Sequence, residues 1–380
     1  MNVEKLDRRP LCWLKALVLI AASLLVPALP AAETGKAVAA PLEIVLVESG
    51  AVTPENVSRW KAEQFKAVAV VLDERTSEAA YRATARRISD GGLELYFWIE
   101  VARNAKLATA HPRWMAALGM HEDWQKNFPN LPEPKSGEVA KTFPWVPIGY
   151  RETFEAHLER IGQLLKRAPS GWRGLLLNDL QAGPSSCGCG NLLCRWAIDY
   201  DVPHTATKLE GNDVAARFLA EVRKRAGGKQ VVPVWTTECE EVDLPAGKNQ
   251  GRPGTGLCGK VGCATATCPQ VFTRQWSEVA SGHEGPIGLL ALPTALQRTQ
   301  TEFGGGPGWV TNAVAYLNRT IPANGGKMIP ADRLWVVVEG APAANETTTR
   351  KLAAQAGAGA VIVARTPIDQ SYEPRMIPVK

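Results

Sequence analysis

The chain has 380 residues, of which 45% are hydrophobic and 21% are charged. This composition is ordinary for a globular protein, and it excludes a disordered chain, a collagen-like chain and a small disulfide scaffold. The formal net charge of +5 is mild for this length, and the lysines and arginines are spread along the sequence. Nucleic-acid binding therefore has little support.

The first 32 residues have the pattern of an export signal. Lys5, Arg8 and Arg9 precede an almost wholly apolar run over residues 17–29, and small residues suited to cleavage follow it. This run is shorter than the roughly 20 residues of a membrane span, so we expect cleavage, with an uncleaved anchor as the alternative. The expected organisation is a signal peptide (1–32), a linker (33–41) and one domain (42–380). The mature protein would be secreted or periplasmic, without a stable membrane partner.

From residue 42 onward, short apolar runs rich in β-branched residues alternate with helical patterns. The expected strands are 42–48, 67–73, 93–100, 174–179, 230–238, 287–292, 334–339 and 360–365. The expected helices are 54–65, 77–89, 151–166, 213–226, 271–280, 309–317 and 346–356. A long polar and aromatic connection is expected over 101–150. Pro233 is unfavourable inside a central strand.

Apolar strands that alternate with helices predict a parallel sheet covered on both faces. Eight such units in a chain of this length favour an α/β fold of the (β/α)8 TIM-barrel type, with long cysteine-containing loops after the fourth and fifth strands. A doubly wound open sheet is the alternative. No Gly-x-Gly-x-x-Gly follows the first expected strand and no Walker sequence occurs, so nucleotide binding is unsupported. No Gly-x-Ser-x-Gly or His-Glu-x-x-His motif occurs either.

The carboxyl ends of the expected strands collect carboxylates and indoles, and these ends form the active-site face of such a barrel. Paired carboxylates supply the acid and the base or nucleophile of glycoside hydrolysis. Indole rings offer large, flat surfaces that stack on sugars. The alternative is structural: carboxylates after strands also cap helices and form salt bridges, and tryptophans also fill cores. The strand-end residues are Glu48, Asp73, Trp98, Glu100, Asn178, Asp179, Trp235, Glu238, Glu339 and Arg365.

Two of these positions resemble the large glycoside hydrolase superfamily of barrels. Asn178-Asp179 follows the fourth strand and Glu339 follows the seventh, where that superfamily has Asn before its acid/base Glu and, later, its nucleophilic Glu. The resemblance implies Asp179 as general acid/base, one methylene shorter than usual, and Glu339 as nucleophile or base. Glu238 is the reserve catalytic candidate.

The same resemblance implies the groups that contact a carbohydrate. Two indoles would stack on sugar, those of Trp98 and Trp235. Four further side chains would hydrogen-bond to it: Asp73, Glu100, Asn178 and Arg365. The motifs His111-Pro112-Arg113-Trp114 and Phe143-Pro144-Trp145 also look like those of secreted glycoside-hydrolase-like barrel proteins. The resemblance covers residues 42–240.

Seven cysteines follow the expected signal peptide, and they have two interpretations. Cys187, Cys189 and Cys194 form a tight triad that could hold a structural zinc, with Cys239 or a later cysteine as fourth ligand. Export instead favours disulfides. The triad could then pair with Cys258, Cys263 and Cys268 and leave Cys239 over, and six cysteines allow 15 pairings. No other cofactor is required. Secreted glycoside-hydrolase-like barrels often carry a Cys-x-Cys-x-x-Cys cluster after strand four, whereas here four residues separate the second and third cysteines.

The sequence thus leads to three functional hypotheses. The first is a secreted carbohydrate-active barrel that hydrolyses glycosidic bonds with two carboxylates. The second is a catalytically inactive barrel that binds glycans. The third is an exported metal-binding protein that uses the cysteine cluster.

Overall fold

The computed structural model describes residues 40–116, 132, 135–180, 209, 214–236, 284–291, 330–339, 343–368 and 373–378. The expected signal peptide, the helices expected over 271–280 and 309–317, and all seven cysteines of the mature chain lie outside these residues. In the described part, no helix is long and apolar enough to cross a membrane.

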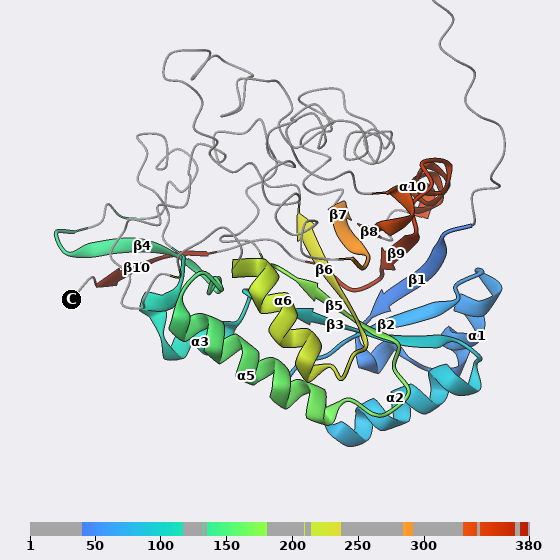
Figure 1. The fold of residues 1–380 in the computed structure, drawn as a ribbon, viewed down its shortest axis with the longest axis horizontal. Helices are drawn as coiled ribbons and strands as arrows, with labels where there is room; N and C mark the ends of the chain where they lie inside the picture. Colours follow the sequence, from blue (N-terminus) through green and yellow to red (C-terminus); the bar gives the residue numbers. More distant parts are fainter. Residues whose placement is uncertain are drawn as a thin grey trace, which may run out of the picture. The chain divides into compact units, whose positions relative to one another are not determined.

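Eight parallel strands form a closed barrel, which confirms the barrel and rules out the open sheet (Figure 1). The strands are β1 (Leu42–Val47), β2 (Ala67–Val71), β3 (Glu94–Glu100), β5 (Gly174–Asn178), β6 (Gln230–Thr236), β7 (Ile287–Ala291), β8 (Leu334–Glu339) and β9 (Ala360–Ala364). They pair in this order, and β9 closes the barrel on β1 with Ile44 opposite Ile362. Pro233 is tolerated within β6, in register with Leu177 of β5.

The described helices follow the expected positions to within a few residues. They are α1 (Pro54–Ala62), α2 (Glu78–Asp90), α5 (Arg151–Arg167), α6 (Val214–Arg225) and α10 (Ala343–Gln355). Side-chain caps begin two of them, because Thr53 accepts a hydrogen bond from the backbone N–H of Asn56 at 3.2 Å and Ser77 accepts one from Ala80 at 3.2 Å. The apolar stripe of α5 packs against α6 through the edge-to-face rings of Phe154 and Phe218.

The connection expected over 101–150 contains regular structure that the sequence did not predict. It holds a short helix, α3 (Ala105–Ala110), and a 3-10 turn, η2 (Pro112–Trp114). Two further 3-10 turns lie elsewhere in the chain, η1 (Ser49–Ala51) and η4 (Ala331–Arg333). Strand β4 (Glu138–Phe143) pairs antiparallel with β10 (Glu373–Pro378), outside the barrel. The pairing joins segments from the middle and the end of the described chain, and local periodicity cannot reveal such a contact.

The barrel wall separates two apolar clusters. Alternation along each strand sends Ile44 and Leu46 into the barrel, whereas Val45 and Val47 face the helices. Large rings fill the interior: Tyr96 and Trp335 meet edge to face with centroids 5.8 Å apart. Gly174 makes room for this filling, because a Cβ there would lie 2.9 Å from the ring of Tyr96. The barrel is therefore a packed core, and a site can form only above it.

Candidate functional site

Three glutamates follow the interior residues at the carboxyl end of the barrel. Glu48 comes directly after β1, Glu100 ends β3 and Glu339 ends β8. Each stands two residues beyond an interior residue of its own strand, respectively Leu46, Trp98 and Val337. Inward positions of alternate strands form one layer in an eight-stranded barrel. Because β1, β3 and β8 are alternate strands, the register places these three backbone positions in one layer at the mouth.

The carboxylate of Glu100 is held by a hydrogen bond on each oxygen. The indole N–H of Trp98 donates to Oε1 at 2.7 Å, and the side-chain amide of Asn178 donates to Oε2 at 2.8 Å. Glu100 and Asn178 are register partners on neighbouring strands, and both donors are buried in the barrel. Glu100 itself is partly exposed. These two donors fix the orientation of the Glu100 carboxylate.

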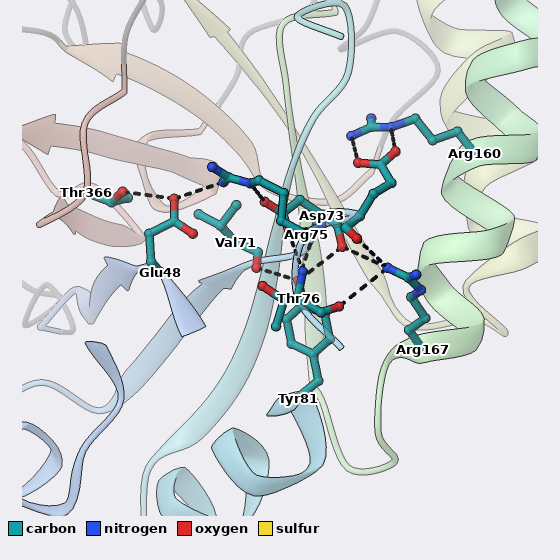
Figure 2. A network of polar contacts seen from close by, with 10 residues as sticks. Glu48, Val71, Asp73, Arg75, Thr76, Tyr81, Arg160, Arg167 and Thr366 are labelled. Carbon is teal, nitrogen blue, oxygen red and sulfur yellow. Dashed lines mark hydrogen bonds and ion pairs between the residues drawn. The ribbon is translucent and has the colours of Figure 1, made fainter. Parts of the chain in front are cut away.

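Arg160 of α5 fixes the same strand end from outside the barrel. Its guanidinium donates to the backbone carbonyl of Glu100 at 2.8 Å and to the two carboxylate oxygens of Glu74 at 2.5 and 3.3 Å. Burial acts to raise the pKa of Glu74, but the hydrogen bonds and charge of Arg160 outweigh it and lower that pKa. Figure 2 shows the two contacts that Arg160 makes with one carboxylate.

The carboxylate of Asp73 binds groups of the loop between β2 and α2 (Figure 2). Its carboxylate accepts hydrogen bonds from the backbone N–H groups of Arg75 and Thr76, at 3.0 and 3.2 Å, and pairs with the Arg75 guanidinium. Arg75 also lies 3.5 Å from Glu48, whose carboxylate accepts a 3.4 Å hydrogen bond from Thr366. These contacts tie the ends of β1, β2 and β9 together, and they leave Asp73 a structural role.

Asp179 directly follows Asn178 and differs from Glu100 in its environment. Its side chain is fully buried, and its backbone lies in the left-handed region with φ of 60°. Aspartate tolerates this conformation better than most residues. The backbone carbonyl of Asp179 accepts a hydrogen bond from Ala102 at 3.2 Å, which joins the β5 end to the segment after β3.

The two expected sugar-stacking indoles have different outcomes. Trp98 is only 1% exposed, so it offers no face to a sugar and instead supports Glu100 from below. Trp235 lies in β6, in register with Leu289 of β7. The side chains of Trp235 and Glu339, and the whole of Glu238, lie outside the described residues.

Arg365 lies away from the mouth, contrary to expectation. Its guanidinium lies 2.7 Å from the carboxylate of Glu63 and 3.4 Å from that of Glu346, and 5.3 Å from the ring centre of Phe65. Arg350 joins this cluster from α10. Phe65 belongs to the apolar cluster that faces the helices, so Arg365 connects the helical layer where the first and last units meet.

The sequence therefore assigned Glu100 and Asn178 to the site but missed their partnership and the support from Trp98 and Arg160. The parity of β3, with Tyr96, Trp98 and Glu100 on one face, was the available signal. No group of three or more His, Cys, Asp or Glu side chains suited to a metal ion occurs within the described ranges. All four cysteines expected at a zinc site fall outside those ranges.

No protein-family model matches this sequence, and the search of curated proteins also found no match. Solved structures similar to the chain include an alpha-amylase from Lactobacillus plantarum, at 11% identity and a TM-score of 0.39, covering 85% of this chain and 70% of the amylase. A D-psicose 3-epimerase from Clostridium cellulolyticum H10 has 11% identity and a TM-score of 0.32, covering 85% and 83%. A chitinase from Chromobacterium violaceum has 9% identity and a TM-score of 0.31, covering 78% and 68%. The barrel assignment rests on the strand pairing of this chain itself.

Proposed function

We propose that this protein is an exported, carbohydrate-active barrel that hydrolyses glycosidic bonds with carboxylates at the carboxyl ends of its strands. The observation that carries the proposal is the preorganised carboxylate of Glu100, held by Trp98 and Asn178 at the mouth of a closed barrel. Active sites of such barrels form at this face. Glycoside hydrolysis needs carboxylates on two sides of one bond, and the register places Glu100 and Glu339 on strands across the barrel.

The resemblance to glycoside hydrolases assigns the chemistry to Asp179 as acid/base and Glu339 as nucleophile or base. The proposal itself requires a pair of strand-end carboxylates; this assignment is the one that the resemblance implies, with Glu238 in reserve. A zinc or disulfide cluster formed by the cysteines would be structural under this proposal and would take no part in hydrolysis.

The test is a hydrolysis screen with the full-length exported protein. A panel of 2,4-dinitrophenyl α- and β-glycosides reports bond cleavage without need of an acid, and release of reducing sugar from polysaccharides reports complete catalysis. We expect turnover by the wild type, loss of polysaccharide cleavage in Asp179→Asn and Glu339→Gln, and no change in Glu155→Gln, an exposed α5 control. Polysaccharide cleavage that survives in both site variants would contradict the assigned pair.

The second candidate is a glycan-binding barrel without catalysis. The full burial of Asp179, the expected acid, favours it. This candidate predicts saturable oligosaccharide binding by calorimetry and no turnover of any aryl glycoside in the panel. The hypothesis of an exported metal-binding protein predicts stoichiometric zinc in the purified protein. It also predicts that fewer free thiols are counted after the metal is removed and the protein is oxidised than before.

A further inference from the structure

The resemblance places the two catalytic carboxylates after the fourth and seventh barrel strands. The described geometry instead favours Glu100, the carboxylate at the end of the third strand, β3. Asp179 is fully buried and its backbone has a φ of 60°, so its carboxylate would have to move before it met a sugar. Glu100 is partly exposed and belongs to the layer directly above the packed interior. Glu100 therefore combines partial exposure with a carboxylate that is held by two hydrogen bonds.

We propose that Glu100 is the catalytic nucleophile of this barrel, with Trp98, Asn178 and Arg160 as its positioning residues. The inference rests on the proposed function, since it names the residue that attacks the sugar. It differs from the roles implied by the resemblance, because the nucleophile comes from β3 and Glu339 becomes the acid/base partner.

The contacts of Glu100 suit a nucleophile better than an acid. Nitrogen donors approach both carboxylate oxygens, at 2.7 and 2.8 Å, so each oxygen is held as a hydrogen-bond acceptor. Among the described residues each oxygen accepts one hydrogen bond, whereas a carboxylate offers about four acceptor sites in all. The donors come from the same strand and from the neighbouring strand, and they leave the carboxylate little freedom to rotate. Such fixed geometry lowers the barrier to attack.

Arg160 adds a second level of positioning. It binds the backbone carbonyl of Glu100 at 2.8 Å, and its own position is set by the bidentate pair with Glu74 (Figure 2). Its side chain is only 13% exposed, which limits its motion. The end of β3 is thereby held from the helical layer, while the carboxylate is held from within the barrel.

The reaction is a double displacement. An oxygen of Glu100 attacks the anomeric carbon, the bond to the leaving oxygen breaks, and that oxygen takes a proton from the acid, which we assign to Glu339. Water then attacks the anomeric carbon of the glycosyl ester, gives its proton to the ionised Glu339 and releases the Glu100 carboxylate. The anomeric configuration is therefore retained.

The experiment uses the full chain and the aryl glycoside that the wild type hydrolyses fastest. A 2-deoxy-2-fluoro analogue of that glycoside traps the covalent intermediate, and peptide mass spectrometry locates the label. We expect one label, on the peptide that contains Glu100, and a product of retained configuration by NMR. A label on Asp179 or Glu339, or an inverted product, would overturn the inference and leave the proposed function standing. Absence of any wild-type turnover would instead overturn the proposed function.

Variants separate catalysis from folding. Glu100→Gln should lose at least about a thousandfold in kcat/KM, and Glu100→Ala should recover turnover of the dinitrophenyl glycoside with azide, giving a glycosyl azide of opposite configuration. Trp98→Phe keeps the aromatic filling but removes the donor to Oε1. It should lower the rate of fluoro-sugar labelling by about a hundredfold, as small misplacements of reacting groups do, with KM little changed. Equal labelling rates in Trp98→Phe and wild type would refute the positioning role.

Discussion

His157 gives the most direct test of the energetics of this fold. It lies on α5, its side chain has 0% exposure, and its Nε2–H donates to the backbone carbonyl of Val146 at 2.8 Å. Nδ1 has no hydrogen-bond partner among the described residues. Burial is the main cause that lowers the pKa of His157 to about 4; the nearby charge of Arg160 also lowers it, and the Val146 hydrogen bond opposes.

The direction of the pH effect on stability follows from the protonation of His157 in the unfolded and the folded chain. The unfolded chain takes up this proton near pH 6.5 and the folded chain only near pH 4, so acid favours unfolding between these values. The contribution of neutral His157 to the free energy of unfolding is fully present above pH 6.5, and it is lost as the pH falls to about 4. At about 1.4 kcal/mol for each pKa unit, the total is about 3 kcal/mol. Typical unfolding free energies are about 5–15 kcal/mol, so this loss is large.

The perturbation is His157→Gln, whose amide nitrogen can still donate to Val146 but does not titrate. Urea unfolding is followed by tryptophan fluorescence at pH 8, 7, 6 and 5. Between pH 8 and 5 the wild type should lose about 2 kcal/mol more than the variant, because most of the unfolded-state protonation occurs in that interval. Other titrating groups are common to both proteins and cancel in the difference. Parallel pH dependences of wild type and variant would refute the reasoning.

Two further predictions concern packing and the helical layer. Gly359→Ala should destabilise the protein by about 2–3 kcal/mol, because a Cβ there would lie 1.8 Å from the backbone oxygen of Asp332; Gly50→Ala, with nothing within 4 Å, is the control. A Gly359→Ala melting curve that coincides with the control would contradict the packing at this site. Arg365→Met should lower the unfolding free energy by about 1–2 kcal/mol, since it removes the 2.7 Å pair with Glu63. Unchanged stability in urea would show that this ion pair contributes nothing.

The barrel was predictable from the sequence because its signals are local. Each strand is a short apolar run, and the helices carry periodic stripes such as that of α5. The parallel sheet then follows from the alternation of the two, whereas its closure is decided by the pairing of β9 with β1. The two-stranded antiparallel sheet of β4 and β10 was missed because Phe143 pairs with Glu373, a contact between segments that no local pattern links. Pro374 and Pro378 also lie within β10, and proline is unfavourable in strands, so the sequence of this segment indicates a loop.

The candidate site likewise has features that the sequence predicts and features that only the tertiary structure decides. The order of residues alone placed Glu100, Asn178 and Asp179 at strand ends, because the end of an apolar run marks the mouth of a barrel. Only the tertiary structure decided that Trp98 and Asn178 hold Glu100, that Asp179 is buried, and that Arg365 binds Glu63 in the helical layer. The physical reason is that burial and side-chain partners depend on neighbouring strands and helices, whereas propensity and periodicity depend only on residues close in the chain.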